Sequence, residues 1–360
     1  MLMTADAVGG VWSYALDLCS ALAGVRFIVA TLGPQPGTTQ RAAVARLANV
    51  SLIESDLRLE WMAGGQGDVA ASRDWLMSLA RQHDVDLIHV NGYAQVPLAG
   101  MLPTIAVAHS DVLSWWNAVY GEAAPDDWND YRCAVTAGLR RASRVVALTA
   151  AGCDDLQRHY GFPRQRVTVI PNGIVDAVSP VLVKRSVVFA AGRVWDAAKN
   201  LRLLDEIAPD LPWPVEIAGD TMHPEHGLAV LNRAQALGSL DRAMLRRRLA
   251  SAAIYAAPAR YEPFGLGILE AASAGCALLL SDIPSLRENW DGAAILLPPD
   301  EPRRWREAIR RLIDNDAERD RLQRAARTRA RHFPLALMAA RYRTLYQELI
   351  GAAVSYEGVA

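Results

Sequence analysis

Short apolar runs rich in Val, Ile and Ala alternate along this sequence with longer amphipathic stretches, and this alternation constrains the fold more than any other feature. Such runs are typical of parallel strands buried on both faces of a sheet, with helices covering the faces. The sequence therefore predicts an α/β fold. The strands expected in the first half span residues 25–32, 85–90, 104–108, 144–148 and 167–170, with 50–61 as a candidate for a further strand.

A second series of such runs begins after residue 180 and predicts a second sheet. A length of 360 residues also favours two domains over one core. We place the boundary in 172–184, where Asn-Gly and Ser-Pro are typical of a linker. The expected domains are 1–175 and 176–335, and a last helix, about 336–360, is expected to pack back on the first domain. The strands of the second half are expected at 187–191, 215–218, 254–257, 277–281 and 294–297, and helices at 12–22, 72–82, 200–207 and 266–274.

The charge balance narrows the classes of partner. The net charge of −1 gives no basic excess, which argues against a nucleic-acid partner. The tail 302–350 is Arg-rich and helical by its period, but its interspersed Glu and Asp favour a solvated helix face over an anion-binding surface. A local basic face is compatible with a neutral total, so peripheral contact with a membrane stays open.

The lack of a recognisable targeting signal and the cysteine pattern together predict a cytoplasmic protein. Residues 1–22 lack a basic start and a long apolar run, and residues 1–6 leave room only for a short first strand. The sequence contains no stretch of about 18 apolar residues without a charge, so it predicts no transmembrane helix. Cys19, Cys133, Cys153 and Cys276 are far apart, without metal-ligand or disulfide spacing, and fit thiols of a reducing compartment.

The segment 261–270, Tyr-Glu-Pro-Phe-Gly-Leu-Gly-Ile-Leu-Glu, carries the strongest functional signal. It predicts a loop that leads from a strand into a helix, whose free N–H groups and dipole favour phosphate. Gly265 and Gly267 lack a Cβ and allow phosphate to approach the backbone. Glu262 in the loop and Glu270 one turn into the helix are suited to accept hydrogen bonds from sugar hydroxyls. The alternative is a Gly-containing turn before an ordinary helix with two solvated glutamates.

This Glu-x7-Glu pattern, with Glu-Pro-Phe-Gly-Leu at 262–266, resembles the signature of the GT4 family of retaining glycosyltransferases. The resemblance implies the GT-B fold: two doubly wound Rossmann-like domains facing each other across a cleft, the first binding the acceptor and the second the nucleotide-sugar donor. It runs from about residue 9 to residue 300 and is carried also by 169–173, 189–193, 271–276 and 281–288.

The resemblance also implies roles for single residues. Arg193 and Lys199 match the pair that holds the donor diphosphate, and a cation after a strand end with another before the next helix is a reasonable anion clamp. Glu270 would bind the ribose and Glu262 the sugar hydroxyls. Asn172 and Gly173 match a stretch near the cleft, although a plain Asn-Gly turn explains them almost as well. The implied donor-binding set is Gly10, Asn172, Arg193, Lys199, Glu262, Phe264, Gly265, Leu266, Gly267 and Glu270, and the implied catalytic set is His109, Glu262, Arg193 and Lys199.

On the acceptor side, Gly9 and Gly10 resemble the family's N-terminal glycine loop, and His109, after the strand 104–108, its cleft histidine. A structural histidine is an equal alternative. The candidate acceptor residues are Gly9, Asn91, Tyr93, His109 and Asp111, with Trp115 and Trp116 read more readily as core.

The expected reaction is front-face transfer with retention of configuration, without a cofactor or catalytic metal, from a UDP-sugar as the default donor to an unknown hydroxyl acceptor. Asp-x-Asp pairs, typical of metal-dependent transferases, occur at 84–86 and 314–316, but both are expected to be structural. Glu270 occupies the third glycine position of a dinucleotide fingerprint, which argues against NAD. Two alternatives remain: a nucleotide-sugar epimerase or hydrolase using His109 as acid or base, and a non-catalytic nucleotide-sugar-binding partner subunit. The intact pairs Arg193–Lys199 and Glu262–Glu270 argue against the second.

Overall fold

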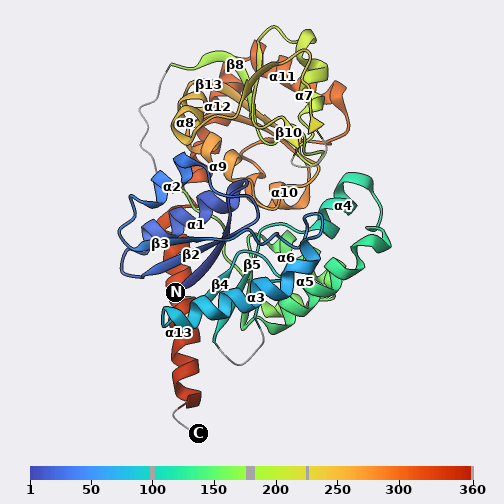
Figure 1. Cartoon of the computed structure of the whole chain (residues 1–360). Coiled ribbons are helices and arrows are strands. Elements are labelled where there is room, and N and C mark those ends of the chain that lie inside the picture. Colours follow the sequence, from blue (N-terminus) through green and yellow to red (C-terminus); the bar gives the residue numbers. More distant parts are fainter. Residues whose placement is uncertain (98–101, 176–182, 224–226, 358–360) are drawn as a thin grey trace. The chain divides into compact units, whose positions relative to one another are not determined.

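The computed structural model describes residues 1–97, 102–175, 183–223 and 227–357. They divide into two compact units (Figure 1). The N-terminal unit consists of Met1–Asn117, Glu122–Gly173 and the C-terminal segment from Leu335; the C-terminal unit consists of Ala118–Gly121 and Ile174–Pro334. Most of the expected linker falls on 176–182, which lie outside the described residues.

The N-terminal unit is built on a parallel sheet of seven strands in the order β3-β2-β1-β4-β5-β6-β7. All five strands expected in this half are present, and the candidate region 50–61 contains β3. The strands are β1 (Leu2–Asp6), β2 (Phe27–Leu32), β3 (Val50–Glu54), β4 (Ile88–Val90), β5 (Thr104–Ala108), β6 (Arg144–Ala147) and β7 (Val167–Val169). The helices are α1 (Gly10–Ala21), α2 (Thr38–Val44), α3 (Gly65–Gln82), α4 (Val112–Tyr120), α5 (Asn129–Arg141), α6 (Ala150–Tyr160) and α13 (Leu335–Glu357), with 3-10 turns η1 (Asp126–Trp128) and η2 (Arg164–Arg166).

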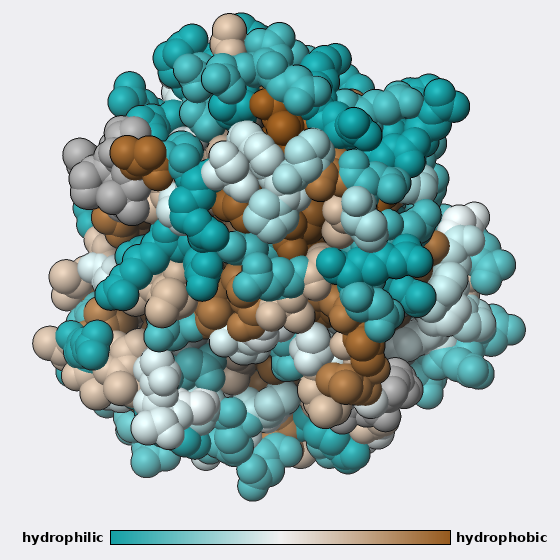
Figure 2. Space-filling model, turned by 90° about the horizontal axis from the view of Figure 1, so that it is seen from above, coloured by the Kyte–Doolittle hydropathy of each residue, from teal (hydrophilic) through white to brown (hydrophobic). Residues whose placement is uncertain are grey.

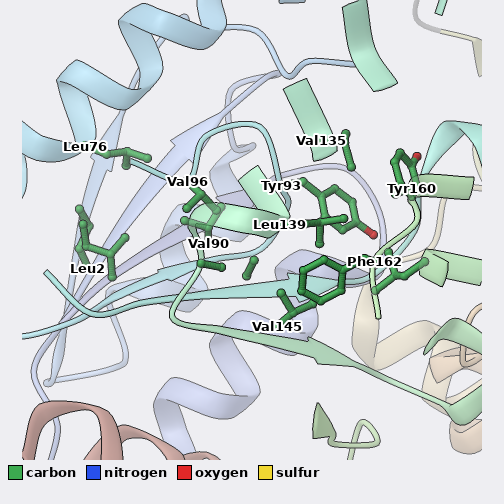
Figure 3. Packing of buried hydrophobic residues seen from close by; sticks show 14 of the residues in the cluster. Leu2, Leu76, Val90, Tyr93, Val96, Val135, Leu139, Val145, Tyr160 and Phe162 are labelled. Atoms are coloured by element: carbon green, nitrogen blue, oxygen red, sulfur yellow. The ribbon is translucent and has the colours of Figure 1, made fainter. Parts of the chain in front are cut away.

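The core of this unit lies where strands and helices bury their apolar faces (Figure 3). Val90 and Val145 from the sheet pack in one cluster with Leu139 of α5. Gly138 allows α5 to come this close, because a Cβ at this position would lie 1.9 Å from the carbonyl oxygen of Tyr93. The helix thereby fixes the loop that follows β4.

The C-terminal unit repeats the arrangement with six parallel strands in the order β12-β9-β8-β13-β14-β15. The strands are β8 (Arg185–Ala191), β9 (Val215–Ala218), β12 (Gln235–Gly238), β13 (Ala252–Ala257), β14 (Ala277–Ser281) and β15 (Ile295–Leu297), with a separate antiparallel pair β10 (Met222–His223) and β11 (Gly227–Leu228). The helices are α7 (Arg202–Ile207), α8 (Arg242–Ser251), α9 (Leu266–Ser273), α10 (Pro284–Trp290), α11 (Pro302–Asp314) and α12 (Asp316–Ala330), with a 3-10 turn η3 (Ala208–Asp210). The sequence did not predict β10, β11 and β12, because they are short and β12 is a largely exposed edge strand.

The Arg-rich tail is helical, as predicted, and is divided into α11, α12 and α13. On α11, Arg303 pairs with Glu307 and Arg304 with Glu301, and these side chains are largely exposed. The interpretation as a solvated helix face is confirmed there.

Figure 2 shows one face of the molecule, on which hydrophilic side chains predominate and hydrophobic ones form separate patches. In the described part of the chain, no helix combines the length and apolar character needed to cross a bilayer.

Each sheet has one point at which the strand order reverses. In the N-terminal unit this point lies between β1 and β4, and in the C-terminal unit between β8 and β13. The loops that leave such a pair diverge to opposite faces of the sheet, and ligands of doubly wound folds bind outside the carboxyl ends of these strands. The fold thus marks four loops as places for a site.

Candidate active site

The loop after β8 presents the first cation. The guanidinium Nη2 of Arg193 lies 2.6 Å from Oδ2 of Asp196 and its plane covers the ring of Trp195 at 5.2 Å. The Asp196 side chain is 3 % exposed, and its other oxygen accepts a hydrogen bond from the N–H of Ala198 at 2.9 Å. The Nε of Arg193 is buried and has no hydrogen-bond partner among the described residues. Arg193 is therefore oriented by Asp196, while its side chain stays 37 % exposed.

The second cation, Lys199, ends the same loop. Its Nζ lies 2.7 Å from Oε2 of Glu262 in the loop after β13, and both side chains are about one-fifth exposed, at 23 % and 18 %. The stem of Lys199 lies beside Gly192, where a Cβ would be 3.4 Å from the lysine Cγ. The two loops at the reversal point of this sheet thus meet through an ion pair, and Lys199 comes close to the segment that carries Arg193.

Asn200, which follows Lys199, holds this loop in place. Its φ of 53° lies in the left-handed region, and the residue is buried. The side-chain amide donates hydrogen bonds to the carbonyl oxygens of Pro258 at 3.0 Å and Pro299 at 2.8 Å. One side chain therefore ties together the loops that follow β8, β13 and β15.

Helix α9 begins at the residue the sequence indicated. Gly265 is its N-cap with φ 89°, a conformation that L side chains rarely adopt, and Leu266 is its first residue. The first N–H groups of the helix, from Leu266 onward, have no partner within it. Phe264 packs edge-on against Phe333 at 5.6 Å and is 2 % exposed. Its side chain is an anchor in the core, so it can serve the expected donor set only through its backbone.

The two glutamates of the motif lie around one buried hydroxyl. Burial raises the pKa of Tyr255 on β13, and the carboxylates of Glu262 and Glu270 raise it further. The phenol donates a hydrogen bond to the carbonyl oxygen of Ala191 at the end of β8. A Cβ on Gly267 would lie 3.2 Å from this hydroxyl. Tyr255 forms the floor of the site, and sequence reasoning did not identify it because it reads as an ordinary buried strand residue.

In the N-terminal unit, the loop after β1 contains the expected glycines. Gly9 caps α1 with φ 88° and ψ −154°, a region open essentially to glycine alone, and Gly10 begins the helix. Both residues are exposed. The start of α1 therefore offers free N–H groups beside a backbone without side chains.

His109 follows β5 and is half-buried. Its Nε2 lies 3.0 Å from Oδ1 of Asn91, which follows β4, and its ring meets Tyr14 of α1 edge-on at 4.6 Å. Burial, together with the nearby His89, lowers the pKa of His109 to about 3. His109 is neutral at physiological pH and is suited to hydrogen bonding with an uncharged hydroxyl.

Other residues of the expected acceptor set are occupied inside the unit, and the acceptor interpretation of their side chains is corrected accordingly. Tyr93 is 2 % exposed and lies in the core cluster (Figure 3). Asp111 precedes α4 and accepts hydrogen bonds from the N–H of Ser114 at 2.8 Å and from the Tyr160 hydroxyl at 2.7 Å. Trp116 packs against the core, as expected.

Asn172 and Gly173 lie in a buried segment after β7. Asn172 is 3 % exposed, and the N–H of Gly173 lies 3.2 Å from Sδ of Met338 on α13. This environment favours the structural alternative for Gly173. Oδ1 of Asn172 is buried without a hydrogen-bond partner among the described residues, so the donor-binding role of Asn172 stays a prediction.

The two Asp-x-Asp pairs lie at ends of secondary structure, as expected. Asp84 adopts φ 47° in the turn before β4, at the edge of the sheet opposite to the carboxyl ends. Asp314 ends α11 and Asp316 begins α12, where it pairs with Arg319. Neither pair belongs to the loops that carry the other candidate residues.

Sequence comparisons assign the family. The family model described as Glycosyltransferase Family 4 matches residues 8–177, and that described as Glycosyl transferases group 1 matches residues 185–315. The chain belongs to the GT4 family of glycosyltransferases. A similar curated relative, the glycogen synthase of Mycobacterium tuberculosis, is 26 % identical over 337 residues, which cover 85 % of this chain and 76 % of the relative.

Solved structures show the same fold for this glycosyltransferase. The sucrose-phosphate synthase of Thermosynechococcus elongatus matches with a TM-score of 0.79 at 18 % identity, over 98 % of this chain and 100 % of that one. Alr3699/HepE of Anabaena, in complex with UDP-glucose, matches with a TM-score of 0.75 at 18 % identity, over 97 % and 99 %. The predicted GT-B fold is confirmed, and the protein is a nucleotide-sugar-dependent glycosyltransferase.

Proposed function

We propose that this glycosyltransferase transfers a sugar from a UDP-sugar to a hydroxyl acceptor with retention of configuration and without a catalytic metal. The observation that carries the proposal is the pairing of Lys199 with Glu262, which brings a cation and a sugar-binding carboxylate together at the start of α9. We assign donor binding to the C-terminal unit and acceptor binding to the N-terminal unit.

The leaving diphosphate is the group that needs stabilisation. Arg193 and Lys199 supply two fixed cations, and the first turn of α9 supplies N–H groups. Asp196 pairs with Arg193, and Asn200 fixes the backbone next to Lys199, before the donor arrives, so little reorganisation is needed during the reaction. This arrangement performs the charge stabilisation for which other transferases use a divalent metal.

The ion pair between Lys199 and Glu262 also opens when the donor binds, and each side chain then takes a new partner. When the diphosphate binds Lys199, the carboxylate of Glu262 gains freedom to accept hydrogen bonds from the sugar hydroxyls. Glu270 lies one turn into α9 and accepts hydrogen bonds from the ribose. UDP as the nucleotide is supported by the structural likeness to the Anabaena protein that was solved with UDP-glucose.

The chemistry follows from these contacts. The bond between the anomeric carbon and the phosphate oxygen breaks, while the acceptor oxygen bonds to the same face of that carbon. The proton of the acceptor hydroxyl passes to the departing phosphate oxygen. Within the N-terminal unit, Gly9 and Gly10 leave room for substrate at the start of α1, and His109 contacts a substrate hydroxyl.

A thermal-shift screen in EDTA tests the donor assignment. UDP, GDP, ADP and their sugar conjugates are each added, and a ligand at 100 times its dissociation constant stabilises the folded state by about 2.7 kcal/mol. We expect stabilisation by UDP and a UDP-sugar, its loss in Arg193→Met and Glu270→Ala, and its retention in the control Glu307→Ala, whose side chain lies on the exposed face of α11. Binding that requires Mg²⁺ or Mn²⁺ refutes metal independence, and no binding under any condition refutes the donor site.

A further inference from the structure

A chain of polar side chains joins the C-terminal helix α13 to His109 inside the N-terminal unit. Tyr346 on α13 places its hydroxyl oxygen 2.8 Å from Nδ1 of His89, which is fully buried on β4. Nε2 of His89 lies 3.1 Å from Oδ1 of Asn91, and the same oxygen lies 3.0 Å from Nε2 of His109. Tyr346 and His89 are 257 residues apart in the sequence, so this contact is a product of the fold alone.

The directions of these hydrogen bonds follow from one fixed end. The side-chain nitrogen of Asn91 donates to the carbonyl oxygen of Thr4 at 2.8 Å, and a carbonyl only accepts. Oδ1 of Asn91 therefore faces the histidines, and it too only accepts. Its two lone pairs take a hydrogen from Nε2 of His89 and one from Nε2 of His109. The Tyr14 hydroxyl also lies 3.3 Å from Nε2 of His89, where it accepts a share of the same hydrogen.

This assignment sets the tautomer of both rings. Burial lowers the pKa of His89 to about 3, and burial together with His89 does the same for His109, so each neutral ring carries a single N–H, at Nε2. Nδ1 of His89 is then an acceptor, and the hydroxyl of Tyr346 donates to it. Nδ1 of His109 is also an acceptor, and it has no hydrogen-bond partner among the described residues.

We propose that Tyr346 is a positioning residue, which through His89 and Asn91 holds His109 as the Nε2–H tautomer with the lone pair of Nδ1 directed to a substrate hydroxyl. The proposal rests on the proposed function in taking His109 to meet a substrate. Without the Tyr346 donor, His89 can carry its hydrogen on Nδ1 instead, because the Tyr14 hydroxyl, 3.3 Å from Nε2 of His89, can then donate to that nitrogen. Its Nε2 and Oδ1 of Asn91 would then be two acceptors in contact, which displaces the amide that His109 needs.

Two variants separate the links of this chain. Tyr346→Phe removes only the donor hydroxyl, and Tyr342→Phe is its matched control. Tyr342 lies one turn earlier on α13, is equally buried, and packs its ring on His89 at 5.4 Å, without a hydrogen bond to either histidine within the described structure. His109→Gln keeps an amide donor where Nε2 stands and removes the acceptor of Nδ1.

The first readout is nitrogen NMR of ¹⁵N-histidine-labelled enzyme without ligand, with His109 identified by its absence in His109→Gln. We expect His89 and His109 both as neutral Nε2–H rings in the native protein and in Tyr342→Phe, and a change of tautomer in Tyr346→Phe. An Nδ1–H or charged His109 in the native protein overturns the proposal, as does an unchanged spectrum of Tyr346→Phe. Because no ligand is present, this result does not depend on the proposed function.

The second readout is function. We expect unchanged UDP affinity in all three variants, because UDP lacks the transferred sugar and the acceptor. We expect a kcat/KM for transfer about three- to tenfold lower in Tyr346→Phe and at least tenfold lower in His109→Gln. A rise in KM for the UDP-sugar shows that the substrate hydroxyl contacted by His109 belongs to the donor. A rise in KM for the acceptor shows that it belongs to the acceptor. Equal loss in Tyr342→Phe and Tyr346→Phe overturns the proposal, whereas failure of the native enzyme to bind UDP refutes only the proposed function.

Discussion

Asn200 allows a test of how the loop after β8, which carries Arg193 and Lys199, is held in place. The residue combines a left-handed φ of 53° with two side-chain hydrogen bonds to the carbonyl oxygens of Pro258 and Pro299. In Asn200→Ala both bonds are lost, at about 1 kcal/mol each, and the left-handed backbone costs a further 1 kcal/mol or about 2 at most. The free energy of unfolding is therefore expected to fall by about 3–4 kcal/mol.

Asn200→Gly isolates the backbone contribution. Glycine adopts the left-handed conformation freely, so this variant loses the two hydrogen bonds and a smaller entropic cost of about 0.5–1 kcal/mol. We expect it to be about 1 kcal/mol more stable than Asn200→Ala. The comparison separates the conformation of residue 200 from its clamp on the neighbouring loops.

Differential scanning calorimetry measures both effects. For a unit of roughly 160 residues, 1 kcal/mol corresponds to about 2–4 °C in Tm. Asn200→Ala is expected to lower the transition of the C-terminal unit by roughly 6–15 °C, and Asn200→Gly by a few degrees less. Changes below about 2 °C, or identical Tm values for the two variants, refute the clamp as an element that fixes Lys199.

Three further predictions concern separate parts of the structure. Lys199→Met is expected to weaken UDP binding by about 10- to 150-fold, the loss of one charge-assisted contact, and unchanged affinity in calorimetric titration contradicts this. Gly265→Ala forces a left-handed conformation and places a Cβ 2.7 Å from Cδ1 of Ile268; it should therefore lower Tm more than Gly292→Ala, where φ is 77° and no atom lies within 4 Å. His89 has a folded pKa near 3 and an unfolded value of 6.5, so below pH 6.5 the unfolded chain binds a proton that the folded one does not. Acidification to pH 5 should cost about 2 kcal/mol of stability relative to the pH profile of His89→Gln, measured by urea unfolding, and parallel profiles refute it.

Much of the fold was predictable because its signals are local. Buried parallel strands are continuous apolar runs, and such runs located β5, β9 and β14 to within a residue. Edge strands lack this signal: β12, with the sequence Gln-Ala-Leu-Gly, is largely exposed and carries no apolar pattern. Its place in the sheet comes from pairing with β9, which no local pattern shows.

The local structure of the candidate site was predictable where the motif fixes residue type and spacing. Glu262, Gly265 and the first turn of α9 fall where the motif indicated. The partners that hold the site were not predictable, because they come from other segments or have another common explanation. Asp196 reads as a loop carboxylate, and Tyr255 as a strand residue, until the fold brings them to the site.

For the expected acceptor residues, the sequence predicted the position in the fold but not the direction of the side chain. Tyr93 and Asp111 follow the carboxyl ends of strands, where ligands of such sheets bind, and this position alone suggested a binding role. The chain then directs their side chains into the core and onto the start of α4. A strand-end position restricts where a residue lies but does not determine which way its side chain points.

The configuration of the product shows whether transfer proceeds with retention and without a metal. The enzyme is incubated in EDTA with the nucleotide sugar selected by the thermal-shift screen and a panel of hydroxyl acceptors, and early proton NMR spectra are recorded for the anomeric signals. From an α-linked UDP-sugar, we expect UDP and an α-linked product with the native enzyme and neither with Lys199→Met. A β-linked first product, or transfer that begins only when a divalent metal is added, contradicts it.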